Sequence, residues 1–600
     1  MKSFFKTFFA ALTAVVIGFF IVSMFGLVMF GGVVSSISST STFTLKDKTV
    51  LKLDLNGILS DREDENPLNS LMGVTSIGIN DVLDAIKKAK ENDKVEGIYI
   101  KCDHLETGAA SLEPIRKALV DFRESGKFIV SYGDIYTQGG YYLASVADKV
   151  ILNPQGSLDF QGMSRQIQFQ RGMYEKLGVK YQVYKVGTFK SAVEPYIQDQ
   201  MSEANREQTA SYLNDAWSHW LTNIAESRKL SVEMLNEYAD KYLAFYGADS
   251  ILQFGLVDTL LYVTEVETYL KELTSTDVKE DIRLASVKDM KGVDPKEKKK
   301  SKNQIAVLYA EGTIVSDGQE NSLLSGSTIT AKQYVRELQK LKDDEEVKAV
   351  VFRVNSGGGS AYVSEQIWHA VSELKKVKPI VVSMGDYAAS GGYYISCAAT
   401  SIVAEPTTLT GSIGIFGLIP EGEELAKKMG VSFDEVKTNK HSGLGGSAIG
   451  IPFVISAYSK AFTEDQGQIL QQYVERGYDV FITRCAEGRS MTKESIDAIG
   501  QGRVWTGNQA FANGLVDKLG GVEDAVNLAA EAAELDDYTI HNYPKKADFM
   551  TELIKSSLGG AKVKMAKFIM GEEDYKQQMM LQTLKTAEIC VAEMPERISF

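Results

Sequence analysis

The sequence predicts an α/β protein in which two homologous domains follow an N-terminal transmembrane helix. Three observations support this: an internal repeat, an alternation of helical and strand-forming segments, and a long uncharged segment near the N-terminus. A chain of 600 residues also exceeds what one hydrophobic core usually holds, so at least two domains are expected. Its 44% hydrophobic and 24% charged residues are those of an ordinary globular protein.

The uncharged segment runs from Thr7 to Val34. As a helix it would reach about 42 Å, more than the ~30 Å hydrocarbon core of a bilayer. A cleaved signal peptide is the alternative, but its apolar region should be only about 7–15 residues long and end at a small-x-small site, which is not clearly present. Lys2 and Lys6 precede the segment and the next basic residue is Lys46, so the positive-inside rule predicts export of everything that follows. We therefore expect residues 1–45 to form a cytoplasmic stub and a single lipid-contacting anchor, with the bulk periplasmic in a bacterium.

The internal repeat has a shift of 252 residues. INDVLDAIKKAKENDKVEGIYIK, from Ile79, aligns with AKQYVRELQKLKDDEEVKAVVFR, from Ala331, and both predict an amphipathic helix leading into an apolar strand. At the same shift, SYGDIYTQGGYY from Ser131 aligns with SMGDYAASGGYY from Ser383, with seven of twelve positions identical. The chain therefore contains two copies of one domain.

The repeat and the composition predict the domain limits. We expect an N-terminal domain over residues 46–287, a lysine-rich linker over 288–304, a C-terminal domain over 305–537, and an extension of unknown role over 538–600. Within each copy, apolar runs such as GIYIK and AVVFRV alternate with helical stretches. This alternation implies βαβ crossovers and a largely parallel, buried sheet.

Charge and cysteine usage exclude several classes of function. A formal net charge of −14 and a pI near 5.2 disfavour nucleic-acid binding, which needs clustered lysine and arginine. The cysteines lack C-x-x-C spacing and so suggest neither a zinc site nor a disulfide framework. They are Cys102, Cys397, Cys485 and Cys590. We expect no metal or organic cofactor.

A glycine run in the C-terminal copy is the first candidate for chemistry. RVNSGGGS, ending at Ser360, follows a predicted strand, and the glycines at 357 to 359 can adopt positive φ. Their amides could form an oxyanion hole, for which Gly358 and Gly359 are the candidates. A tight turn from strand to helix is the structural alternative.

A serine near a predicted helix start is the second candidate. In DYAASGGYY, Ser390 ends a predicted strand and precedes two glycines, so a tight turn would expose its hydroxyl at the helix N-terminus. A serine hydroxyl is unreactive near neutral pH unless a base takes its proton. A Ser-His-Asp arrangement could use His369 or His441 with Asp386, while the other three histidines stand in no catalytic sequence context.

Lysine is the other possible base, since burial among apolar groups lowers a lysine pKa and leaves a neutral amine. At the shift of 252, Ser390 aligns with Gln138, and Lys190 aligns with Ser442. One copy has the serine without the lysine, and the other has the lysine without the serine. We therefore predict one site shared by both copies, with Ser390 as nucleophile and Lys190 as base. A site within the C-terminal copy alone, using the lysine at 437 or 440, is a competing hypothesis.

Three motifs resemble one family. VGTFKSAVEP around Lys190, GDYAASGGYY around Ser390 and TLTGSIGIFG around Ser412 look like the long form of bacterial signal peptide peptidase, also called protease IV, from the anchor to about Asp524. The resemblance implies tandem Clp-protease/crotonase-like domains, a homotetramer at the membrane and cleavage of signal peptides left there after export. It also implies that Ser390 and Lys190 form the catalytic dyad, and makes Ser412 a candidate for orienting the amine.

The resemblance also implies a mechanism. Lys190 takes the proton of Ser390, and Gly358, Gly359 and the amide of Gly391 stabilise the oxyanion. Substrates would be signal peptides and other apolar, extended peptides. Two alternatives stay open: a crotonase-type enzyme acting on an acyl-CoA, and a non-catalytic membrane scaffold.

Overall fold

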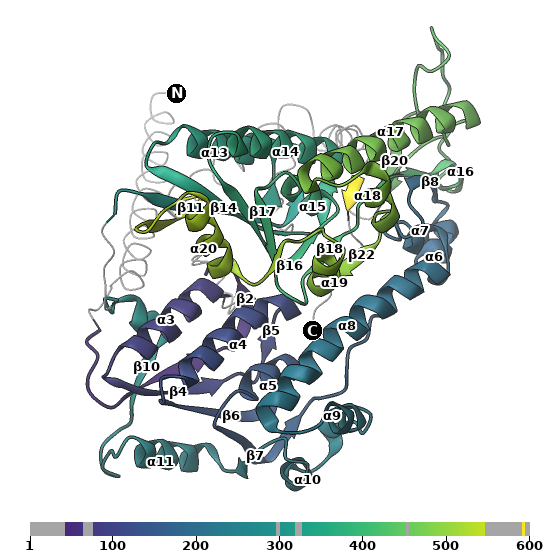
Figure 1. Cartoon of the computed structure of the whole chain (residues 1–600). Coiled ribbons are helices and arrows are strands. Elements are labelled where there is room, and N and C mark those ends of the chain that lie inside the picture. The colour runs from purple at the N-terminus through teal and green to yellow at the C-terminus, as the bar shows by residue number, and fades with distance from the viewer. Residues whose placement is uncertain are drawn as a thin grey trace, which may run out of the picture.

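A computed structural model describes residues 43–63, 76–295, 301–317, 327–451, 455–545 and 591–593, together with Gly18 (Figure 1). The predicted transmembrane helix between Thr7 and Val34 lies outside these residues, apart from Gly18. Across the described part of the chain, no helix is both long enough and apolar enough to span a membrane.

The N-terminal half is built on a parallel sheet with the strand order β10-β1-β4-β6-β7-β9. Its strands are β1 (Thr49–Asp54), β4 (Val95–Lys101), β6 (Phe128–Tyr136), β7 (Lys149–Leu158), β9 (Thr259–Leu260) and β10 (Arg283–Ser286). A small sheet lies beside it, in the order β3 (Ser76–Gly78), β2 (Gly57–Ser60) and β5 (Leu105–Glu106). The helices of this half are α3 (Ile79–Glu91), α4 (Ala109–Arg123), α5 (Gln138–Ala144), α6 (Arg171–Leu177), α7 (Glu194–Ile197), α8 (Glu203–Arg228), α9 (Val232–Ala239), η1 (Leu243–Phe245), α10 (Ala248–Gln253), α11 (Val263–Leu273) and α12 (Val287–Lys291).

The C-terminal half has a second sheet with the path β22-β18-β16-β14-β11-β24, to which β17 and β23 are attached. Its strands are β11 (Gln304–Glu311), β14 (Val347–Ser356), β16 (Ile380–Ala389), β17 (Ser401–Ala404), β18 (Leu409–Gly411), β22 (Val504–Thr506), β23 (Lys518–Leu519) and β24 (Thr539–Tyr543). Its helices are α13 (Ala331–Asp343), α14 (Ala361–Lys375), α15 (Gly391–Ser396), α16 (Glu423–Lys428), α17 (Glu464–Arg489), α18 (Lys493–Ile499), α19 (Gly507–Ala512) and α20 (Val522–Ala532). β24, from the stretch that the sequence left without a role, pairs in parallel with β11.

The central strands are apolar on both faces because both faces are covered. On β14, Val350, Phe352 and Val354 enter one core, whereas Ala349 and Val351 enter a second core beneath α20. Continuous apolar runs of this kind are typical of parallel sheets with helices on both sides. The predicted α/β class is confirmed.

The repeat is visible in equivalent elements. α3 leads into β4 and α13 leads into β14, as the aligned sequences predict. Thr330 caps α13 by accepting a hydrogen bond from the amide of Gln333, and Tyr334, Leu338 and Leu341 form its buried stripe. Both halves continue into a long helix, α8 or α17.

A third sheet joins the two halves, in the order β13-β12-β15-β25-β19-β21-β20 with β8 paired to β19. Its strands are β8 (Lys180–Val186), β12 (Thr313–Ile314), β13 (Thr328–Ile329), β15 (Gly358–Ser360), β19 (Ile415–Glu421), β20 (Ala448–Ile451), β21 (Ile455–Tyr458) and β25 (Val591–Glu593). β8 comes from the N-terminal half and pairs with all of β19, antiparallel. Figure 1 shows β8, α6 and α7 at the side of the C-terminal half, from where α8 runs back to the N-terminal sheet.

Buried polar contacts also hold the halves together. Asp61 makes two hydrogen bonds with Arg353, at 2.9 Å to Nε and 2.8 Å to Nη2, and both side chains are almost fully buried. Asp386 accepts hydrogen bonds from the amide and the hydroxyl of Ser111. These contacts set the orientation of one half relative to the other, since a buried charge needs its partner.

Candidate active site

Ser390 lies at a strained turn between β16 and α15. Its φ of 56° and ψ of −113° fall outside the regions that a non-glycine residue normally adopts. Its amide donates to the carbonyl of Gly411 at 2.8 Å, and its side chain is fully buried. Gly392 permits the close approach of this turn to β14, because a Cβ there would lie 2.4 Å from the carbonyl oxygen of Ser356. The local sequence thus holds the hydroxyl at the start of a helix, as predicted, but the predicted exposure of the hydroxyl is wrong because the surrounding elements bury the turn.

Lys190 lies in the loop between β8 and α7, and it is also fully buried. The amide of Phe189 donates to the carbonyl of Gln501 at 2.8 Å, which attaches the loop to the C-terminal half. Gly502 packs on the backbone of Lys190, since a Cβ at this position would lie 2.6 Å from the lysine amide nitrogen. The β8–β19 pairing and these contacts carry a lysine of the N-terminal half into the C-terminal half.

The structure brings the two predicted residues together. Nζ of Lys190 donates a hydrogen bond to Oγ of Ser390 at 2.7 Å. It also donates to the hydroxyl of Ser412 at 3.1 Å and to its carbonyl oxygen at 3.2 Å. The ring centroid of Phe416 lies 6.0 Å from the same nitrogen. A nucleophile and its base need this hydrogen-bonding separation.

Ser412, the third predicted residue, follows β18 in a left-handed conformation with φ of 48°. Its amide donates to the carbonyl of Arg503 at 2.7 Å. With the backbone held there, both oxygens of Ser412 accept hydrogen bonds from Lys190. This arrangement orients the amine toward Ser390.

The predicted oxyanion glycines lie on β15, next to the turn that carries Ser390. Gly358 has φ of 105° and Gly359 has φ of 146°. A Cβ on Gly359 would lie 2.0 Å from the carbonyl oxygen of Ile314, so the backbone approach requires glycine. The amide of Gly358 donates to Oγ of Ser356 at 3.2 Å. Gly391, the third candidate, is the first residue of α15.

The candidates for a histidine triad have other contacts. His369 is exposed on α14, and His441 is exposed beside Asp465, 3.9 Å from its carboxylate. Asp386 binds Ser111 of the other half. These contacts give no support to a Ser-His-Asp arrangement.

The competing lysines are on the surface. Lys437 pairs with Glu435, and Lys440 pairs with Asp465 with 74% of its side chain exposed. Neither has the burial that favours a neutral amine, whereas Lys190 does.

Sequence reasoning did not identify Gln208, on α8. Its Nε2 donates to the carbonyl of Phe189 and to Oγ of Ser191, each at 3.0 Å, and its Oε1 accepts from the amide of Val504 at 3.1 Å. Gln208 therefore holds the Lys190 loop against the C-terminal half. No motif surrounds it, so only its contacts reveal this role.

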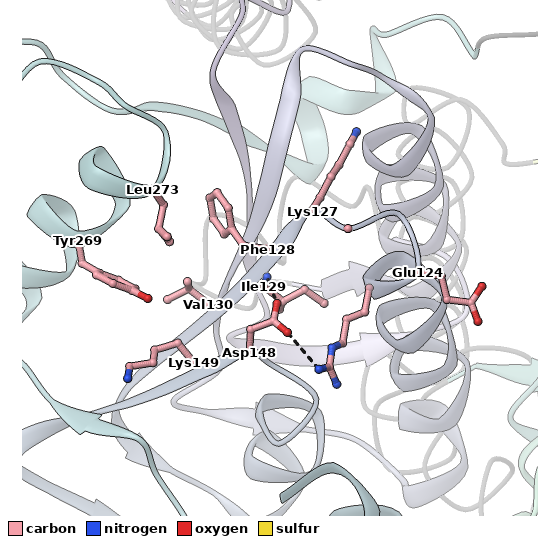
Figure 2. A pocket seen from close by; sticks show the side chains of 11 residues that line it. Glu124, Lys127, Phe128, Ile129, Val130, Asp148, Lys149, Tyr269 and Leu273 are labelled. Carbon is pink, nitrogen blue, oxygen red and sulfur yellow. Dashed lines mark hydrogen bonds and ion pairs between the residues drawn. The ribbon is translucent and has the colours of Figure 1, made fainter.

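A separate surface pocket of about 550 Å³ opens on the N-terminal half, between α11 and the start of β6 (Figure 2). Phe128, Lys149 and Tyr269 are among its lining residues, and Asp148 there binds Arg123. None of its lining residues belongs to the Lys190–Ser390 site. Within the described ranges there is also no group of three His, Cys, Asp or Glu side chains that could hold a metal ion.

Comparison with known families identifies the chain. The profile of peptidase family S49 matches residues 121–277 and 372–536, one segment in each half. The chain belongs to peptidase family S49. "Protease 4" of Salmonella typhi is 36% identical over 558 residues, which cover 90% of this chain and 87% of that protein. This S49 peptidase is therefore a serine protease, and its sequence is that of a long-form signal peptide peptidase. The enzymatic class predicted from the sequence is confirmed.

Two further similarities concern parts of this S49 peptidase. "Putative signal peptide peptidase SppA" of Enterococcus faecium is 34% identical over 246 residues, covering 40% of this chain and 67% of that protein. The solved structure of a ClpP1 mutant from Listeria monocytogenes shares 14% sequence identity and has a TM-score of 0.23, covering 37% of this chain and 94% of that one.

Proposed function

We propose that this S49 peptidase is a membrane-anchored endopeptidase that uses a Ser390/Lys190 dyad to cleave signal peptides left in the membrane after export. The observation that carries the proposal is the 2.7 Å hydrogen bond between Lys190 Nζ and Ser390 Oγ in a fully buried site. Burial matters because a lysine can act as a base only when its amine is neutral, and an apolar environment disfavours the charged form.

The proposed reaction proceeds in two stages. Neutral Lys190 takes the proton of Ser390 while the hydroxyl oxygen attacks the peptide carbonyl, and the amine then protonates the leaving amino group. Amides of Gly358, Gly359 and Gly391 donate to the developing oxyanion. Water, deprotonated by the same amine, releases the acyl group and regenerates the serine. Ser412 orients the amine throughout.

The proposed substrates and location rest on other features. An anchor between Thr7 and Val34 would retain the enzyme at the inner membrane with both halves in the periplasm, where spent signal peptides remain. These peptides are apolar and can adopt the extended conformation that a protease site requires. We propose a homotetramer as the functional assembly.

Mass spectrometry of the products of synthetic signal peptides tests the proposal. The wild-type enzyme should release defined fragments, and Ser390→Ala should release none. A globular protein substrate of equal concentration is the control for substrate class. Equal cleavage by wild type and Ser390→Ala would contradict the assignment of the nucleophile, and faster cleavage of the globular protein would contradict the substrate class.

A further inference from the structure

A second lysine, Lys185 on β8, lies beside the loop that carries Lys190. Its Nζ donates a hydrogen bond to the backbone carbonyl oxygen of Lys190 at 3.3 Å. Where β8 pairs with β19, Lys185 lies directly opposite Phe416, and the ring centroid of Phe416 is 6.0 Å from Nζ of Lys190. Opposite residues of two paired strands project from the same face of the sheet. The side chain of Lys185 therefore stands on the face that the amine of Lys190 approaches.

The hydrogen bond limits how far apart the two amines can be. The carbonyl oxygen and Nζ of one extended lysine are separated by at most roughly 9 Å, so the two amines lie within roughly 12 Å of each other. At an effective dielectric constant of about 20, a positive charge at this distance changes the pKa of a second amine by about one unit. The amine of Lys190 is thus within range of the charge on Lys185.

Lys185 forms no ion pair with any residue that the structure describes. Its side chain is half-buried, and its amine donates to the carbonyl of Lys190. On α17, the side-chain amide of Gln471 donates to the backbone carbonyl of Lys185 at 3.3 Å and to Glu475 at 3.0 Å. The carboxylate on that helix is therefore engaged by an amide. A half-buried lysine carries a positive charge at neutral pH, and here no carboxylate in contact with it offsets that charge.

The other charged groups around the Lys190 loop belong to Arg503, Glu207 and Glu194. Nη1 of Arg503 lies 3.0 Å from Oε1 of Glu207, so these two charges largely offset each other. The buried carboxylate of Glu194, on α7, accepts hydrogen bonds from Ser202 and Asn205, which stabilise its negative charge. This carboxylate favours the ammonium form of Lys190, and the positive charge of Lys185 opposes it.

The charge on Lys185 acts in the same direction as the burial of Lys190. A like charge nearby disfavours the charged form of an amine, and a neighbouring cation is one of the ways in which a lysine is activated. We propose that Lys185 is a positioning residue for the reaction, whose ammonium group on the carbonyl of Lys190 helps to keep the amine of Lys190 neutral. This inference rests on the proposed role of Lys190 as the base.

The pH dependence of kcat/KM for a synthetic signal peptide, measured at low ionic strength, tests the proposal. Lys185→Gln keeps a hydrogen-bond donor but removes the charge, whereas Lys185→Arg keeps the charge. In Lys185→Gln the rising limb of the profile should move about one pH unit higher, with a rate about tenfold lower below the midpoint and a nearly wild-type plateau at high pH. Lys185→Arg should restore the wild-type midpoint.

Lys180→Gln is the matched control. Lys180 is the exposed first residue of β8, and five residues of strand place it roughly 17 Å from Lys185. Its loss should leave the midpoint in place. An unchanged midpoint in Lys185→Gln would overturn the inference, and an equal loss of rate at every pH would make Lys185 a structural contact. The midpoint does not depend on the fraction of folded enzyme, so partial unfolding of a variant does not hide the result.

Labelling of Ser390 by a fluorophosphonate probe gives a readout that needs no peptide cleavage. The probe reacts with an activated serine, so its rate should rise with pH along the same limb and show the same shift in Lys185→Gln. Identical labelling profiles for Lys185→Gln and the wild type would overturn the inference. If labelling shifts as expected but the wild-type enzyme cleaves no signal peptide, the proposed function fails while the role of Lys185 stands.

Discussion

Lys190 and Ser390 are 200 positions apart in the chain, and their side chains share a hydrogen bond of 2.7 Å. The lysine comes from the N-terminal copy of the repeat and the serine from the C-terminal copy. Each copy lacks the residue that the other supplies, so the docking of the two halves creates the site.

Replacement of the lysine should separate the two hypotheses about the base. We expect Lys190→Ala to lower kcat/KM by about 10² or more, because unassisted serine attack lacks the general-base contribution. Lys437→Ala and Lys440→Ala should keep near wild-type rates, since both side chains pair with surface carboxylates. Initial rates on one fluorogenic peptide measure all three variants.

Because both residues meet within one chain, mixing Lys190→Ala with Ser390→Ala chains under conditions that exchange subunits should restore no activity. Full activity of Lys190→Ala alone would contradict a dyad between the halves, and recovery on mixing would contradict a site made within one chain.

Removal of the Ser412 hydroxyl should slow the reaction without weakening substrate binding. Ser412→Ala loses the 3.1 Å contact to Nζ of Lys190 but keeps the carbonyl contact at 3.2 Å. One orienting hydrogen bond is worth about 1–1.5 kcal/mol, so kcat should fall roughly tenfold while KM stays within about twofold. Ser396→Ala, at another buried serine of the same region, is the control and should leave kcat unchanged. A rise in KM at constant kcat would show that Ser412 acts on substrate binding instead.

The buried ion pair between the halves should contribute strongly to stability when one partner is removed. Asp61→Asn or Arg353→Met leaves the other charge buried without its partner, which costs about 3–5 kcal/mol. The double variant should cost less than the sum of the two. Lys117 and Asp524 form a comparable pair across the same interface, but 69% of the lysine side chain is exposed, so Lys117→Met should cost less than about 1 kcal/mol. Chemical denaturation of the four variants measures these differences, and additive effects of Asp61 and Arg353 would argue against their coupling.

Glu405 should make stability fall as pH rises. Burial, reinforced by the nearby carboxylate of Glu113, raises the pKa of Glu405 to about 8. The unfolded chain loses this proton near pH 4.5 and the folded chain near pH 8, so the folded state binds more protons between these values and loses stability across that window. The shift corresponds to about 5 kcal/mol at most.

Glu405→Gln tests this contribution because an amide carries no titrating proton. Its melting temperature should exceed that of the wild type at pH 8.5 and differ little from it at pH 5. Parallel melting curves for the two proteins across the whole pH range would contradict the assignment.

The position at which the core of the N-terminal half begins should decide how many N-terminal residues can be deleted without loss of stability. Leu45 is 6% exposed and packs in the core of the N-terminal half, with Phe43 packed against it. Deletion of residues 1–42 should therefore leave the fold intact, whereas deletion of 1–45 removes Leu45 and costs about 1.5–3 kcal/mol. Thermal unfolding of the two shortened chains measures this difference, and identical melting temperatures would contradict it.

Local patterns in the sequence determined much of this protein. The apolar runs and amphipathic helices predicted an α/β chain, and the repeat predicted that it contains two copies of one unit. The turn-forming sequence around Ser390 indicated the nucleophile, and the repeat then indicated Lys190, because at the aligned positions each copy lacks the residue that the other has. These inferences succeed because periodicity and duplication are properties of neighbouring or aligned residues.

Apart from the meeting of Ser390 and Lys190, the contacts between distant segments were decided by the tertiary structure alone. Nothing in the sequence of β8 indicates that this strand pairs with β19. Nor does any sequence pattern indicate that Asp61 forms an ion pair with Arg353, or that Gln208 holds the loop of Lys190. The strand formed by Val591 to Glu593 is too short to carry a pattern of its own, yet it lies between β15 and β19. Such contacts depend on how two surfaces fit and on which buried polar groups find partners, and both become defined only when the halves have packed together.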